Sequence, residues 1–240
     1  MSEWWSYRPG DFLLFAPRTY WRLFELENAA SWPLPLLALA LGAGLLVLLR
    51  RPRRWSGRVV ALALALAWAW VGWRFVGERY AAINWAAVYA APLFYIQALL
   101  LAWFGAVRDG LNLSIPPRGS VRLGLALYAY ALILHPLTAL AAGRPLAGAE
   151  IAGIAPDPTA IATLGVLVML PGGGVAGAVA GGVAGPLLAI PLAWCLMSGA
   201  TLATMGAWQA WIPLAAAAVA LAAWLRETFR PRSARAHPDA

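Results

Sequence analysis

One histidine and four uncharged polar side chains interrupt stretches of the sequence that are otherwise strongly apolar. They are Gln97, Tyr128, His135, Thr138 and Ser198. A histidine inside an apolar span can relay protons or bind a metal, and it can equally be a structural residue bonded to a neighbouring helix. The five residues therefore form a candidate polar site within the membrane, and hydrogen bonding between helices is the alternative role.

The sequence contains no motif from which catalytic, cofactor-binding or metal-binding residues can be assigned. All 18 basic residues are arginine, so no lysine is available for a Schiff base with retinal or pyridoxal phosphate. General acid-base chemistry at His135 or Asp157 would need a second positioned group, and the spacing identifies none. Within the glycine-rich residues 172–185, Gly173, Gly177, Gly181 and Gly185 fall at every fourth position, which fits close helix packing or a flexible loop equally well.

The composition predicts an all-α fold, a polytopic transmembrane helix bundle. Hydrophobic residues make up 62% of the 240 residues and charged residues only 12%, whereas soluble domains carry roughly 25% charge. We expect an N-terminal interfacial segment over residues 1–32, a helix bundle over 33–225 and a basic cytoplasmic tail over 226–240. About seven spans are predicted, over residues 33–50, 59–76, 82–107, 121–142, 159–171, 183–201 and 208–225.

A dense arginine cluster directly after the first span predicts its orientation. The cluster comprises Arg50, Arg51, Arg53, Arg54 and Arg58. Arginine stays charged, so such a cluster remains on the cytoplasmic side during insertion. We therefore expect a bacterial inner-membrane protein with its N-terminus outside and its C-terminus in the cytoplasm. The basic residues lie between apolar runs, which indicates the lipid bilayer as partner and does not favour nucleic acid.

The charges of the other connecting segments agree with this orientation. The loop over residues 108–122 and the C-terminal tail are basic, as cytoplasmic segments are. Residues 1–32 carry four acidic side chains against three arginines, and residues 143–158 carry two against one, as expected outside. The short turn around Arg79 is the exception.

Residues Pro17 to about Ala30 are expected to form a helix with one buried face. Tyr20, Leu23, Phe24 and Glu27 recur at helical spacing, and the arginines lie elsewhere on the wheel. Such a helix would shield the edge of the bundle at the membrane surface or act as a lid over an external cavity.

Two shorter patterns give local predictions. Arg74 and Glu78 are four residues apart and could form an ion pair, as an interfacial anchor or in an external vestibule. The Asp157-Pro158 pair is typical of a helix start, with the aspartate as the cap. The span that follows is short for a bilayer, so it could be a half-helix or could continue past Pro171.

The sequence resembles a family of bacterial integral membrane proteins of unknown function. The resemblance rests on aromatic and charged stretches near the N-terminus and on two later stretches, at residues 4–7, 11–15, 18–26, 32–33, 156–167 and 190–206. It covers nearly the whole chain. It implies a polytopic membrane protein and brings no activity, cofactor or site residue with it.

Three classes of function remain open from the sequence. The first is a non-enzymatic accessory or assembly component that contacts other membrane proteins or further copies of itself. It is favoured because few charges lie within spans and no paired carboxylates are recognisable. The second is a small-solute or ion permease with a polar site around His135, since broken helices are common in transporters. The third is a membrane-embedded enzyme.

Overall fold

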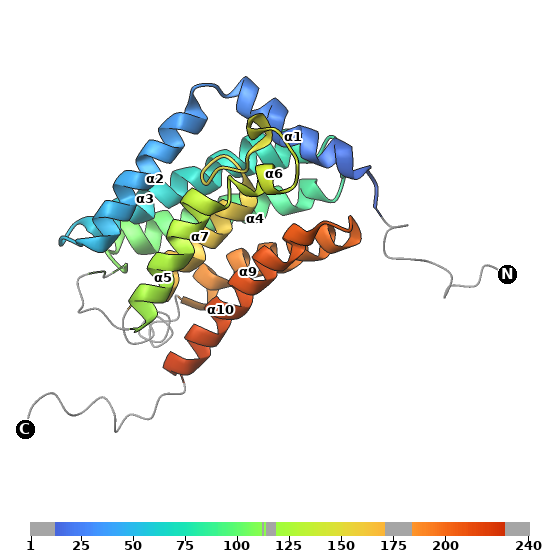
Figure 1. The fold of residues 1–240 in the computed structure, drawn as a ribbon. Coiled ribbons are helices and arrows are strands. Elements are labelled where there is room, and N and C mark those ends of the chain that lie inside the picture. The colour runs from blue at the N-terminus through green and yellow to red at the C-terminus, as the bar shows by residue number, and fades with distance from the viewer. Residues whose placement is uncertain (1–12, 112, 114–118, 171–183, 229–240) are drawn as a thin grey trace, which may run out of the picture.

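The computed structural model describes residues 13–111, 113, 119–170 and 184–228. These residues form helices joined by turns, with an isolated β-bridge between Ala152 and Ala155. The all-α class predicted from composition is thereby confirmed for the part of the chain described (Figure 1).

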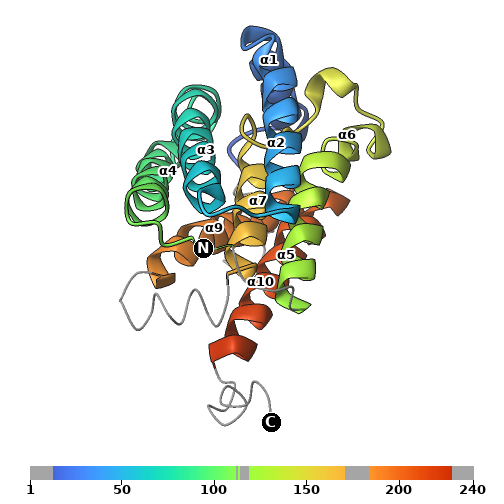
Figure 2. The same cartoon turned by 90° about the vertical axis from the view of Figure 1, so that its left-hand side faces the viewer.

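The first half of the chain forms four long helical segments, two of which end in a π-helical stretch. Their bounds are α1 Pro17–Ala30, α2 Leu34–Arg50, α3 Ser56–Trp70 continued by η3 Val71–Tyr80, and α4 Ala87–Leu100 continued by η4 Leu101–Val107. The α3–η3 and α4–η4 segments pack side by side as a hairpin, which Figure 2 shows as one pair.

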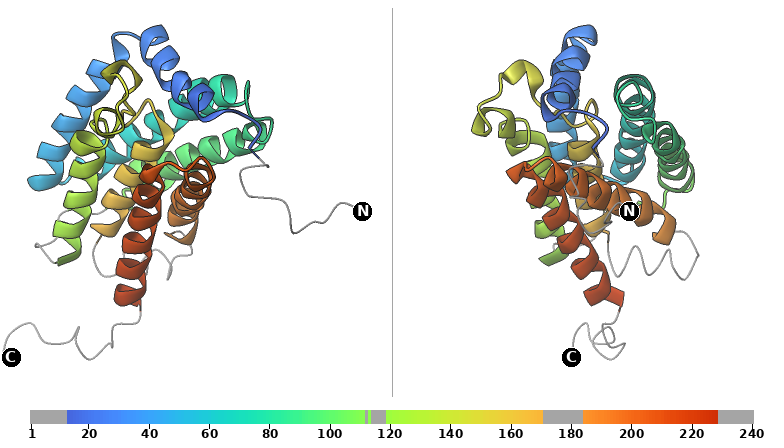
Figure 3. Two further views of the ribbon diagram at one scale, coloured as in Figure 1. Left: turned by 45° about the vertical axis from the view of Figure 1, so that its right-hand side comes forward. Right: turned by 90° about the vertical axis from the view of Figure 1, so that its right-hand side faces the viewer.

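The second half is more broken. It contains α5 Gly119–Ala129, the π-helical η5 Tyr130–Leu134, α6 Thr138–Ala141, the 3₁₀ turn η6 Leu146–Gly148, α7 Pro156–Val168, α9 Ala184–Thr204, the 3₁₀ turn η7 Trp208–Ala210 and α10 Trp211–Thr228. Figure 3 shows α9 and α10 crossing beside α7.

Helix α7 lies at the centre of the bundle. Each of its 13 residues is buried, and it packs against α3, α5, α9 and α10. Glycines allow the closest of these approaches: a Cβ on Gly124 of α5 would lie 2.3 Å from the Gly165 carbonyl oxygen, and one on Gly165 2.7 Å from the Gly124 oxygen. The short fifth segment of the sequence is therefore an interior helix, and its partners cover it on all sides.

Helix α1 lies across one end of the bundle. It begins at Pro17 and ends at Ala30, as predicted, and its buried residues are the predicted set, Tyr20, Leu23, Phe24 and Glu27. The chain then turns by 89° into α2. In Figure 1 the C-terminal ends of α2 and α10 and the N-terminal end of α5 all point away from α1.

Four helical segments among the described residues are long and apolar enough to cross a membrane. They are Ser56–Tyr80, Ala87–Val107, Leu187–Thr204 and Trp208–Arg226, and the bent α1–α2 pair would be a fifth. Gly119–Leu134 and Pro156–Val168 are apolar but shorter. The three other predicted spans, over residues 33–50, 121–142 and 159–171, thus coincide with apolar helices that are bent or shorter. The total of seven spans stays a prediction.

Candidate functional site: a buried acid, histidine and arginine cluster

The position of His135 is set by a π-helical turn. The N–H of His135 donates to the carbonyl of Tyr130, five residues earlier, at 2.9 Å. Such a turn adds one residue relative to an α-helix, so it redirects the side chain that follows, and π-turns are frequent at functional sites. The imidazole is 3% exposed, and the Tyr130 ring meets it edge-on with the centroids 5.8 Å apart.

The loop between α6 and α7 brings a carboxylate to this histidine. The Oε2 atom of Glu150 lies 3.5 Å from Nε2 of His135, and both side chains are 4% exposed. Gly143 and Gly153 adopt positive φ angles, 69° and 90°, near the two ends of the loop, a conformation that glycine enters without strain. These turns fold the loop back onto the bundle and bury Glu150.

Arg144, from the same loop, completes the cluster. Its NH2 atom lies 3.5 Å from Oε1 of Glu150, and its guanidinium carbon lies 3.6 Å from the centre of the Trp21 ring on α1. Burial lowers the pKa of Arg144, and Glu150 opposes that shift. Asn28 of α1 makes a further contact with the loop, because its Nδ2 donates to the carbonyls of Ala147 and Ala149.

Asp157 forms a second buried carboxylate nearby. It receives a hydrogen bond from Trp194 Nε1 at 2.8 Å and another from Ser198 Oγ at 2.6 Å. The side chain is 1% exposed and lies within electrostatic reach of both Glu150 and His135. The expectation that Asp157 caps α7 was wrong, because Ala155 occupies the cap position and the carboxylate bonds across to α9 instead.

A separate charged group lies on the other flank of α1. Glu27, 1% exposed, contacts Nε of Arg79 at 3.0 Å and Nε of Arg74 at 3.7 Å. Arg74 also pairs with Glu78, which confirms the ion pair predicted from their spacing. The arginines thus neutralise a carboxylate that α1 carries into the bundle.

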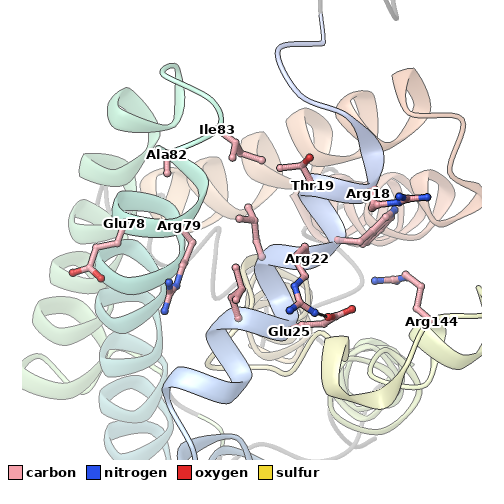
Figure 4. A pocket seen from close by; sticks show the side chains of 12 residues that line it. Arg18, Thr19, Arg22, Glu25, Glu78, Arg79, Ala82, Ile83 and Arg144 are labelled. Atoms are coloured by element: carbon pink, nitrogen blue, oxygen red, sulfur yellow. Dashed lines mark hydrogen bonds and ion pairs between the residues drawn. The ribbon is translucent and has the colours of Figure 1, made fainter.

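A pocket of about 860 Å³ lies along α1 between these two charged groups. Figure 4 shows Glu78, Arg79, Ala82 and Ile83 on one side of α1 and Arg144 on the other. Arg144 therefore links the pocket to the buried Glu150 and, through it, to His135.

The five polar residues singled out from the sequence do not converge. Gln97 donates to the Leu187 carbonyl and Tyr128 donates to the Gly42 carbonyl, both as links between helices. Thr138 donates to the His135 carbonyl, and Ser198 bonds to Asp157. Only His135 and Ser198 belong to the charged cluster, where they contact different carboxylates.

Sequence reasoning missed Glu150 and Arg144, which it counted as charges of an exposed loop. The acidic loop after the most polar span was the available signal, together with Gly143 and Gly153 near its ends. Among the described residues, no three His, Cys, Asp or Glu side chains converge closely enough to hold a metal ion. The carboxylate, imidazole and guanidinium groups of the cluster are thus suited to binding an ion or transferring a proton.

Fold and cluster together define a class: an all-helical protein with apolar helices of membrane-spanning length and buried ionisable side chains. The chain belongs to DUF6064, a family of unknown function, whose model matches residues 18–235. The resemblance to a family of unknown function is thereby confirmed. No curated protein and no solved structure matches the chain.

Proposed function

We propose that the chain is a polytopic protein of the bacterial inner membrane and a permease for a small polar solute or ion. The observation that carries the proposal is the burial of His135, Glu150 and Asp157, each at most 4% exposed, at the end of the bundle covered by α1. His135 lies within a predicted span, where ionisable groups are costly and usually belong to solute, ion or proton pathways.

The exposed face of α4–η4 supports a membrane location. Tyr89, Leu93, Ile96, Leu99 and Trp103 recur every three or four residues, and each is between 44% and 72% exposed. A continuous apolar stripe of this length on a surface helix requires an apolar environment. Lipid hydrocarbon provides it along the whole stripe.

Aromatic and arginine pairs at both ends of the bundle support a membrane location. Arg53 lies over the Trp55 ring and Arg108 over the Trp103 ring, at 5.9 and 5.8 Å, and at the other end Arg74 lies over the Trp73 ring at 5.7 Å. Tryptophan is typical of both membrane–water interfaces, so the orientation rests on the arginine cluster after the first predicted span. The seven spans, with α1 and the Glu150 loop outside, remain part of this proposal.

The accessory role favoured by composition loses its main support in this arrangement. It rested on few charges within the spans and on the absence of paired carboxylates or a ligand cluster in the sequence, whereas the structure buries Glu150 against His135 and buries Asp157 as well. The ring nitrogens of His135 have no hydrogen-bond partner among the described residues. Such groups cost stability, so a polar ligand or a proton pathway explains the cluster better than structural support does.

The test is a transport assay in proteoliposomes made from the purified full chain. Solid-supported-membrane currents would be recorded on addition of short carboxylates, phosphate, amino acids and ammonium. We expect at least one solute class to give a current that Glu150→Gln abolishes, because the substitution removes the charge between Arg144 and His135. Asp109→Asn is the matched control, since Asp109 is exposed and pairs with Arg58 at the other end of α3–η3.

Two other results would replace the proposal. A stoichiometric protein partner that co-purifies in mild detergent, together with no current for any solute, would favour the accessory role. Chemical turnover that requires His135 or Asp157 would favour a membrane enzyme.

A further inference from the structure

We infer that the pocket along α1 binds an organic anion, through a carboxylate or phosphate group held by arginines and an apolar part held beside them. The inference rests on the proposed function, because it names the class of solute that the permease would take. The pocket lies on the side of the molecule that the proposed orientation places outside.

The charges that line the pocket are predominantly positive. Four arginines and two glutamates line it: Arg18, Arg22, Arg79, Arg144, Glu25 and Glu78. Both glutamates are paired, Glu25 with Arg22 and Glu78 with Arg74. Two of the arginines are paired as well, Arg79 with Glu27 and Arg144 with Glu150. Arg18 has no ion pair among the described residues, so the charge left uncompensated in the lining is positive and favours an anion.

The positions of the arginines indicate how such an anion would be held. Figure 4 shows the Arg18 and Arg144 side chains on the same flank of α1. Arg144 lies over the Trp21 ring and pairs with Glu150 through NH2, and its Nε and NH1 atoms are buried with no hydrogen-bond partner among the described residues. The exposed Arg18 is therefore the arginine that offers its planar fork of N–H groups to the oxygens of a carboxylate or phosphate.

Apart from Thr19, the rest of the lining is apolar. Trp21, Leu23, Leu26, Ala82 and Ile83 contribute to the walls. A volume of about 860 Å³ lies within the range of small-molecule sites, which combine apolar walls with a few placed polar groups. An anion with a short hydrocarbon or aromatic part would use both kinds of surface.

The pocket also accounts for the exception to the charge pattern, the turn around Arg79. The positive-inside rule disfavours a basic external turn, yet Arg79 lies at the end of the bundle covered by α1. Its place in the lining of the pocket gives this arginine a role that topology alone does not provide.

The experiment measures binding to the full chain in phosphatidylcholine nanodiscs by isothermal titration calorimetry. The probes are hexanoate, hexyl phosphate and the uncharged hexanol. We expect an anionic probe to bind more tightly than hexanol, and Arg18→Gln to weaken that binding about tenfold, the loss of one charge-assisted hydrogen bond. The matched control Arg122→Gln removes an exposed arginine at the other end of the bundle and leaves binding unchanged.

A second set of nanodiscs, which also contains phosphatidylglycerol, distinguishes the source of the anionic group. If phosphatidylglycerol competes with the anionic probe, the pocket binds a lipid headgroup. If it does not compete, the pocket binds a free solute. Either outcome supports an anion site formed by arginines. Equal binding of hexanoate and hexanol, no binding of any probe, or equal effects of the two variants would overturn the inference. Anion binding without any transport current would refute the proposed permease and still support anion binding in the pocket. A current without anion binding would support the permease and refute anion binding in the pocket.

Discussion

The Asp157 carboxylate joins α7 to α9 through two side-chain hydrogen bonds, and at 1% exposure it has no contact with solvent. Asp157→Ala would leave Trp194 Nε1 and Ser198 Oγ buried without an acceptor. Each unsatisfied group costs about 1–3 kcal/mol, so we expect a clear fall in thermal stability. Asp157→Asn retains an acceptor for Trp194 and should cost less.

Cys195 provides the measurement for this prediction. It is the only cysteine of the chain and is fully buried, so a thiol-reactive fluorescent dye reports unfolding through one known site. The exposed Asp109 is the control, and Asp109→Asn should leave the melting temperature nearly unchanged, because asparagine tolerates the positive φ of 53° at this position. Equal melting temperatures for Asp157→Ala and the native chain would show that the two bonds do not stabilise the fold.

The residue scale also shows where prediction from sequence fails. His135 was found because a histidine in an apolar run is conspicuous. Glu150 lies 15 positions further along in a loop whose signals, its net acidity and the glycines Gly143 and Gly153, do not by themselves predict that the loop turns back into the bundle. The bonds of Asp157 to residues 37 and 41 positions away are equally invisible to helical periodicity.

At the scale of elements, the contact between α5 and α7 depends on two facing glycines. Gly165→Ala would place a methyl group 2.7 Å from the Gly124 carbonyl oxygen and 2.8 Å from the Tyr128 nitrogen. Overpacking of this kind typically costs about 1–3 kcal/mol. We expect a lower melting temperature in the same thiol-dye assay.

Gly44 on α2 is the matched control, because a Cβ there has no neighbour within 4 Å. Gly44→Ala should be tolerated or slightly stabilising, since alanine is the better helix former. If both substitutions had the same effect, helix propensity rather than close packing would explain it.

Elements with one polar and one apolar face were predicted best. The bounds and buried face of α1 follow directly from its spacing of Tyr20, Leu23, Phe24 and Glu27, all of which are buried. The π-helical ends of α3, α4 and α5 were not predicted. A π-helical turn holds one more residue than an α-helical turn, and this leaves the amino-acid composition of the segment unchanged. The glycines of residues 172–185 fitted close packing or a flexible loop equally well; Gly185 lies in α9, and the others lie outside the described residues. The close approach is observed at Gly124 and Gly165.

At the scale of the whole molecule, the proposed orientation can be tested with single cysteines. Leu146, 55% exposed, lies in the loop beside α1, and the exposed Arg54 lies before α3. We expect a membrane-impermeant maleimide to label Leu146→Cys in intact spheroplasts, and Arg54→Cys only after the membrane is opened. The buried Cys195 should give no background, so the native chain is the control. The opposite pattern would invert the topology, with the pocket on the cytoplasmic side.

The composition of the whole chain predicted its helical class, since so little charge leaves few alternatives to apolar helices. It could not predict which helix lies at the centre. Its shortness suggested that the fifth segment is a half-helix or continues past Pro171; α7 ends at Val168, and its partners surround it on all sides.

The position of α7 has a consequence for biosynthesis. At about 1.5 Å per residue, its 13 residues cover about 20 Å, less than the hydrocarbon thickness of about 30 Å. Two of its partners, α9 and α10, follow it in the chain, so they leave the ribosome after it. The helix at the centre of the finished bundle therefore reaches its final environment only when the last helices have been synthesised, and a chain truncated before α9 would present a half-covered α7 to the quality-control proteases of the membrane.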